Sequence, residues 1–169
     1  MAAIARFVRR ARAERGAELI EMAIVTPVLL MIIAGIFDFG MMFRAWEIVT
    51  NAAREGARVG TLPGYSAEDI RLRVEEYMTV AGVTNTCGLN EPAGGASCGA
   101  PPATLCDVCV QTDTVALSAG TVGTRIVTVS SRQPLPSLSV IGTFFGGNFT
   151  SINVASASQM RTEVALTPP

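Results

Sequence analysis

The feature that most constrains this chain is an apolar run near its N-terminus, from Leu19 to Phe43. The run contains two ionisable residues, Glu21 and Asp38, and the sixteen residues between them are uncharged, with Thr26 as the only polar side chain. About 20 helical residues, each rising about 1.5 Å, cross a hydrocarbon core about 30 Å thick. The stretch from Leu19 to Asp38 has this length and keeps its carboxylates near its two ends. The sequence therefore predicts one transmembrane helix.

Composition agrees with a membrane segment joined to one small domain. The 169 residues leave room for one domain plus an appended segment. They are 49% hydrophobic and only 16% charged, whereas a soluble domain is usually about 25% charged. The net charge of −1 argues against nucleic-acid binding, which needs a basic surface. Histidine is absent, so the commonest metal ligand and the commonest general base are missing.

The arginines predict the orientation of the helix. Those before the apolar run are Arg6, Arg9, Arg10, Arg12 and Arg15, and only Arg44 closely follows it. By the positive-inside rule, we expect a cytoplasmic N-terminus and an exported chain beyond Arg44. A buried helix of a soluble protein would not explain this asymmetry. A cleavable signal peptide would have an apolar core of about 7–15 residues and a small-x-small cleavage site, and a mitochondrial transit peptide fits the long run less well.

The helix is expected to continue beyond the membrane. Residues 44–60 are rich in alanine and other good helix formers, and they end at Gly60 before Pro63 and Gly64. A helix over about 18–59 would be about 60 Å long. We therefore divide the chain into a basic cytoplasmic leader at 1–16, a transmembrane and extended helix at 17–60, and an exported domain at 61–169.

A glycine and a glutamate mark the cytoplasmic edge of the run. Glu21 lies inside the apolar segment, where an unpaired carboxylate costs on the order of a few kcal/mol. If a peptidase cut after Gly16, Ala17 would carry a new α-amino group that could pair with Glu21 of a neighbouring subunit. Alternatively, Glu21 lies at the headgroup level and is stabilised by the positive end of the helix dipole. The residues alone leave both interpretations open.

Five short stretches combine into a more specific pattern. They are Arg15-Gly16, Glu18 to Ala23, Asp38-Phe39-Gly40, Asn51 to Arg58 and, near the C-terminus, Ala157 to Glu163. Together they resemble the TadE-like family, minor pilin-like proteins of the tight-adherence (Flp, type IVc) pilus. The middle of the chain, roughly 61–148, carries no such resemblance.

The resemblance implies an envelope protein made as a prepilin-like precursor. A membrane-embedded aspartyl prepilin peptidase would cut between Gly16 and Ala17. The mature chain would then assemble through its N-terminal helix with other pilin-like subunits on a pilus assembly platform, with Glu21 as an assembly residue. Met22 departs from Flp-type pilins, which usually carry an aromatic residue directly after the glutamate.

The exported part is predicted to be a small α+β domain. Ser66 and Asp69 indicate the start of a second, amphipathic helix over 67–81. Alternating apolar and polar residues predict strands, which we expect to form a short antiparallel sheet packed on the helices. The predicted strands are 107–115, 124–131 and 151–160. We expect a loop at 83–102 and an apolar loop at 132–150, which covers the sheet or forms an exposed patch for a partner or the membrane surface.

Four cysteines lie in the exported part: Cys87, Cys98, Cys106 and Cys109. In an oxidising compartment, an even number of cysteines in a domain with a small core favours two disulfides, for which three connectivities are possible. A zinc site of four thiolates is an alternative, although only Cys106 and Cys109 have ligand spacing. A redox pair at Cys106 and Cys109 would need a helix N-terminus, whereas Cys106 is predicted to begin a strand.

These features favour a structural role. We expect a minor pilin-like subunit that contacts membrane lipid, with no catalytic residue, cofactor, metal, small-molecule substrate or nucleic-acid partner. One alternative is an anchored redox protein that uses Cys106 and Cys109. An anchored enzyme using Glu75 and Glu76 fits less well, because neighbouring helical positions point about 100° apart. A signal-anchored envelope receptor or scaffold domain is the remaining alternative.

Overall fold

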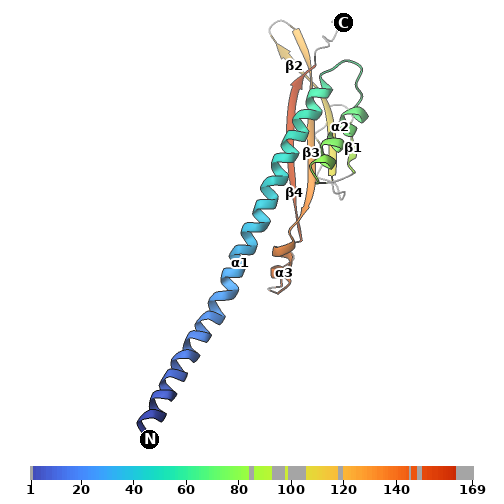
Figure 1. Cartoon of the computed structure of the whole chain (residues 1–169). Coiled ribbons are helices and arrows are strands. Elements are labelled where there is room, and N and C mark those ends of the chain that lie inside the picture. Colours follow the sequence, from blue (N-terminus) through green and yellow to red (C-terminus); the bar gives the residue numbers. More distant parts are fainter. Residues whose placement is uncertain are drawn as a thin grey trace.

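The structure, a computed structural model, describes residues 2–83, 86–92, 98, 106–117, 120–144, 146–147 and 150–162. It is an α+β fold, as the sequence predicts, in which one long helix carries a second helix and a four-stranded sheet (Figure 1). In chain order the elements are α1 (Ala2–Gly60), α2 (Ala67–Val80), β1 (Gly88–Asn90), β2 (Cys106–Leu117), β3 (Gly120–Pro134), α3 (Pro136–Phe144) and β4 (Ser151–Arg161).

The long helix α1 confirms the predicted helix over 18–59 and extends it to Ala2. With 59 residues it is about 90 Å long. Figure 1 shows the sheet and α2 packed along its C-terminal part, whereas its N-terminal part projects away from them. The N-terminal extension is rich in alanine and arginine, which are both good helix formers.

Small residues at the C-terminal end of α1 form one side of the hydrophobic core. Ala52, Ala53 and Ala57 are fully buried there. A Cβ atom added at Gly56 would lie 2.7 Å from Cγ2 of Val74 in α2 and 3.2 Å from Cγ1 of Val127 in β3. The absence of a side chain at Gly56 therefore allows α1 to approach α2 and the sheet closely.

Helix α2 forms where the sequence predicts it. The Ser66 hydroxyl accepts a hydrogen bond from the backbone N–H of Asp69 at 3.2 Å, and the Asp69 carboxylate accepts one from the N–H of Ser66 at 2.8 Å, which completes a capping box. Ile70, Val74 and Met78 lie on one face and are fully buried. The predicted amphipathic face therefore contributes to the core.

An ion-pair cluster joins the solvent sides of α1 and α2. Glu55 of α1 pairs with Arg58 at 2.8 Å and with Arg73 of α2 at 3.0 Å. The hydrogen bonds from Arg58 and Arg73 lower the pKa of Glu55 to about 2, although burial opposes this shift. These pairs lie at the surface, so they add less to stability than the apolar contacts beneath them.

The sheet is mixed, which corrects the prediction of a purely antiparallel sheet. Its order is β1-β2-β3-β4, with β2–β3 and β3–β4 antiparallel and β1–β2 parallel. Strand β1 lies within the segment 83–102 that was predicted to be a loop. A strand of three residues has too few positions to show alternation, so pattern analysis misses it. The three predicted strands are confirmed: β4 is one residue longer than predicted, β2 is three residues longer and β3 is seven residues longer.

The apolar segment 132–150 differs most from its prediction as a loop. Strand β3 continues to Pro134, and residues 136–144 form α3. Pro136 at the first helical position and Gly146, whose φ of +75° suits the turn that ends a helix, are the local signals for α3. They escape notice because α3 has no charged face to give a helical period. Helix α3 packs against α1 and does not cover the sheet (Figure 1).

We predict that Gly56→Ala destabilises the domain by about 1–3 kcal/mol, because the added methyl group overpacks the contact with Val74. Gly40→Ala is the matched control, since no atom lies within 4 Å of a Cβ added there. The measurement is thermal unfolding of the full chain in detergent micelles, followed by circular dichroism. Equal unfolding temperatures for the two variants would contradict the close packing at Gly56.

Candidate functional site

The proposed processing residues lie on an uninterrupted part of α1. Ala17 and Glu21 are exposed, and no atom lies within 4 Å of a Cβ added at Gly16. Among the residues whose side chains the structure describes, none forms an ion pair with Glu21. The glycine, the new N-terminus expected at Ala17 and the glutamate are thus accessible to another protein.

The apolar part of α1 has the dimensions of a membrane span. The helix from Gly16 to Gly60 is long and apolar enough to cross a membrane, and none of its most apolar window is buried in the fold. At about 1.5 Å per residue, Arg15 and Arg44 lie about 43 Å apart, which matches a bilayer with its headgroups. The same spacing places Glu21 and Asp38 about 26 Å apart, close to the two edges of the hydrocarbon core.

Asp38 of α1 holds α3 in place. Its carboxylate is fully buried and accepts hydrogen bonds from the backbone N–H groups of Ser137, at 3.3 Å, and Leu138, at 2.6 Å. These are the second and third residues of α3, where N–H groups have no partner within the helix. Leu135, just before α3, has no side-chain oxygen to cap them. Asp38 therefore supplies from another helix the cap that the local sequence lacks.

An apolar groove lies between α1 and α3, on the N-terminal side of Asp38 along α1. It has a volume of about 560 Å³ and is lined by Pro27, Val28, Leu30, Met31 and Ala34 of α1 and by Ser137, Val140 and Ile141 of α3. The α1 residues belong to the apolar run. The groove is therefore continuous with the surface of α1 that is expected to face lipid.

The cysteines form two disulfides, Cys87–Cys106 and Cys98–Cys109. This is one of the three connectivities that the sequence left open. Because Cys106 and Cys109 bond to different partners, they do not form a redox pair with each other. No thiolate of these four is free to bind zinc, and the described residues contain no other group that could hold a metal ion.

The carboxylates Glu75 and Glu76 have separate structural roles. Glu75 pairs with Arg71 and accepts a hydrogen bond from the backbone N–H of Cys87 at 2.9 Å. Glu76 pairs with Arg73 at 2.7 Å. The two side chains thus fix different contacts of α2 and do not converge on a common site.

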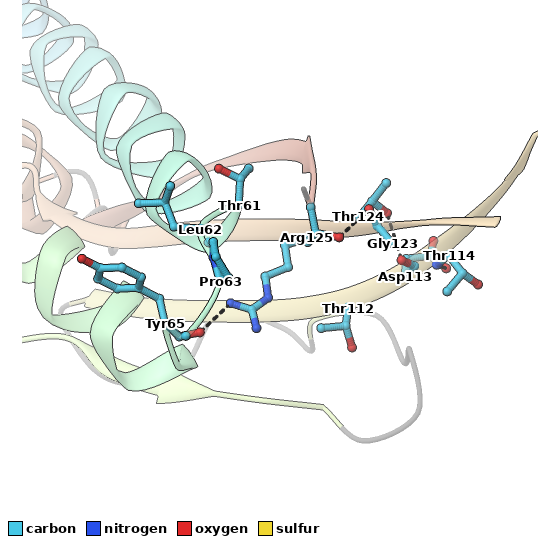
Figure 2. A pocket seen from close by; sticks show the side chains of 13 residues that line it. Thr61, Leu62, Pro63, Tyr65, Thr112, Asp113, Thr114, Gly123, Thr124 and Arg125 are labelled. Atoms are coloured by element: carbon cyan, nitrogen blue, oxygen red, sulfur yellow. Dashed lines mark hydrogen bonds between the residues drawn. The ribbon is translucent and has the colours of Figure 1, made fainter. Parts of the chain in front are cut away.

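A polar hollow lies at the end of the domain farthest from the apolar run, between the turn after α1 and strands β2 and β3 (Figure 2). Its volume is about 590 Å³. The Arg125 guanidinium donates to the carbonyl oxygen of Tyr65 at 3.0 Å, and the Asp113 carboxylate accepts from the N–H of Thr114 at 2.7 Å. Both charged side chains of the lining thus have partners within the fold, which does not favour recognition of a charged small molecule.

The comparison with protein families identifies the N-terminal part of the chain. The family model of the TadE-like protein matches residues 16–58. This segment is TadE-like. The match confirms the resemblance found in the sequence and spans Gly16, Glu21, Asp38 and the small residues of α1 that form the core. Neither the search of curated proteins nor the search of solved structures gave a match.

The TadE-like segment coincides with most of α1 and does not include the C-terminal stretch 157–163. Of that stretch, residues 157–161 lie in β4, and Glu163 lies outside the described residues. Sequence reasoning placed Asp38 at the end of the apolar run without giving it a role. Its signal was a carboxylate at a membrane edge, which requires a partner, but the partner is about 100 residues away in the sequence.

We predict that Asp38→Ala lowers the stability of the folded chain by about 1–3 kcal/mol, because the N–H groups of Ser137 and Leu138 lose their acceptor. Asp38→Asn should have a smaller effect, since the amide oxygen can still accept one of these bonds. Glu47→Ala, at an exposed position of the same helix, is the control.

The measurements are thermal unfolding in micelles and limited proteolysis between residues 135 and 150. Helix α3 should be cut faster in Asp38→Ala than in Glu47→Ala. Equal cleavage rates and equal unfolding temperatures would show that Asp38 does not hold α3.

Proposed function

We propose that this protein is a minor pilin-like subunit that takes part in assembling a tight-adherence (type IVc) pilus. At the family level, the TadE-like segment supports a pilin-like protein associated with this pilus system. The observation that carries the proposal is the coincidence of this segment with a helix whose most apolar window is not buried in the fold. Such a helix needs lipid or neighbouring helices around it. When a pilin enters the filament, neighbouring helices replace the lipid.

In this proposal, α1 anchors the precursor in the bacterial inner membrane with residues 1–16 in the cytoplasm. The domain beyond Arg44 lies on the periplasmic or extracellular side. A prepilin peptidase removes the leader after Gly16, and the mature chain contacts other pilin-like subunits and the assembly platform through α1. The domain at 61–169 is a structural module, in agreement with the structural role of the TadE-like family.

Processing is the direct test of the proposal. Intact mass and N-terminal sequencing of the protein from membranes of its native host should give a mature chain that begins at Ala17. Gly16→Leu should block cleavage, because a bulky side chain stands next to the scissile bond. Gly35→Ala, at another open position of α1, should be processed normally. A wild-type chain that still begins at Met1 would favour a signal-anchored receptor or scaffold instead.

The assembly role of Glu21 gives a second prediction. Glu21→Ala should be inserted and cleaved as the wild type is, yet it should reduce pilus formation, because the new amine of Ala17 on a neighbouring subunit loses its carboxylate partner. Glu18→Ala removes a carboxylate just outside the apolar run and serves as the control. The measurement is the amount of pilin in sheared cell-surface fractions. Wild-type amounts from Glu21→Ala would contradict the proposed charge pair.

A further inference from the structure

Helix α3 lies beside the part of α1 that is expected to be in the membrane. If the bilayer is centred between Arg15 and Arg44, its midplane is near residues 29 and 30, and Asp38 is about 13 Å above it. The groove residues from Pro27 to Ala34 then lie between about 4 Å below the midplane and about 7 Å above it. Because α3 contributes to the same groove, it lies at the depth of the outer leaflet.

The composition of the segment around α3 suits this depth. No charged residue occurs between Arg132 and Arg161. Charged side chains are costly in hydrocarbon, whereas a short uncharged segment can enter it. On α3, Val140 is 70% exposed, although it is an apolar residue. Water would make this exposure unfavourable, whereas lipid would not.

Several polar groups of α3 have hydrogen-bond partners within the fold. The Ser139 hydroxyl donates to the carbonyl oxygen of Pro136 at 2.8 Å, and the Thr143 hydroxyl donates to that of Val140 at 2.7 Å. Asp38 accepts the N–H groups of the first turn, and the N–H of Gly147 donates to the carbonyl oxygen of Gly142 at 2.7 Å. A segment in a bilayer must satisfy its backbone groups internally, and these bonds serve that requirement at the first turn of α3 and at the Gly142 carbonyl.

Residues above α3 have the character of a membrane–water interface. Arg44 and Trp46 on α1 are both exposed and follow the apolar run directly. Arg132 lies near the end of β3 from which the chain enters α3, and its Nε donates to the Ser151 hydroxyl at 2.9 Å. Tryptophan is enriched at headgroup depth, and arginine side chains near the end of a membrane helix extend to the same interface. Arg44, Trp46 and Arg132 thus stand above α3, and the part of α1 that lines the groove beside it is apolar.

We propose that α3 inserts into the outer leaflet beside α1, and that the groove between the two helices holds the acyl chains of phospholipids. This inference rests on the proposed membrane anchoring of α1. It adds a second membrane contact, made by the exported domain itself, which fixes the domain close to the bilayer surface. Acyl chains suit the groove because its lining is apolar and opens onto the surface of α1 that is expected to face lipid.

Tryptophan fluorescence in vesicles tests this proposal. The native tryptophan is first removed by Trp46→Phe, which leaves the chain without tryptophan. Single tryptophans are then placed at exposed positions in three variants: Val140→Trp on α3, Ile36→Trp on α1 and Val80→Trp at the end of α2, where the side chain is 85% exposed. Each full-length variant is reconstituted into phosphatidylcholine vesicles with or without bromine on the acyl chains. The four cysteines form disulfides in the folded domain, so a variant that does not react with a maleimide is folded.

Brominated chains should quench Val140→Trp to the same extent as Ile36→Trp and should leave Val80→Trp unquenched. Quenching of Ile36→Trp without quenching of Val140→Trp would overturn the insertion of α3 and leave the anchoring of α1 intact. If that unquenched Val140→Trp also had blue-shifted emission, a second copy of the chain would occupy the groove instead of lipid. Absence of quenching at Ile36→Trp would overturn both the anchor and the insertion.

Discussion

The close contact between the C-terminal end of α1 and the rest of the domain is the interaction on which this structure depends. Ala52, Ala53 and Ala57 are fully buried, and Gly56 leaves no room for a side chain. Small residues let α2 and β3 approach the helix axis, so that Val74 and Val127 fill the space that larger side chains would take. The same helix that is expected to cross the membrane thus forms one layer of the core of the domain. Under the proposed anchoring, this one helix would set the orientation of the domain relative to the membrane.

Asp38 adds a second fixed point along α1, about 27 Å from Gly56. Its buried carboxylate ties the chain between β3 and β4 to the helix at the outer edge of the apolar run. Between these two points, β3 and β4 run alongside α1 (Figure 1). The two disulfides act at the other side of the sheet, where they connect strand β2 to the segment between α2 and β2. Each is worth about 2–4 kcal/mol in a domain of this kind, which suits a core made largely of alanine and valine.

The sequence predicts the parts of this fold that depend on local order. The apolar run, the capping box at Ser66 and the alternation in β2, β3 and β4 are all properties of neighbouring residues, and the structure agrees with each. The parallel pairing of β1 and the partner of Asp38 depend on residues far apart in the sequence, so no local pattern contains them. Helix α3 was missed for a related reason. Its environment is α1, and a helix surrounded by apolar groups shows no alternation of polar and apolar faces.

Under the proposed function, the attachment of α3 to α1 affects how the subunit can enter a filament. Lipid chains are as apolar as leucine side chains, so neighbouring helices can replace lipid around α1 without a large hydrophobic penalty. Since Asp38 joins α3 to α1, an α3 inserted as proposed would leave the bilayer together with α1. A neighbouring subunit that packs against residues 27–34 must therefore fill the groove beside Val140 and Ile141. The surface formed by α1, α3 and the groove between them has a more distinct shape than the surface of α1 alone. It would therefore restrict which pilin-like subunits can pack against the chain.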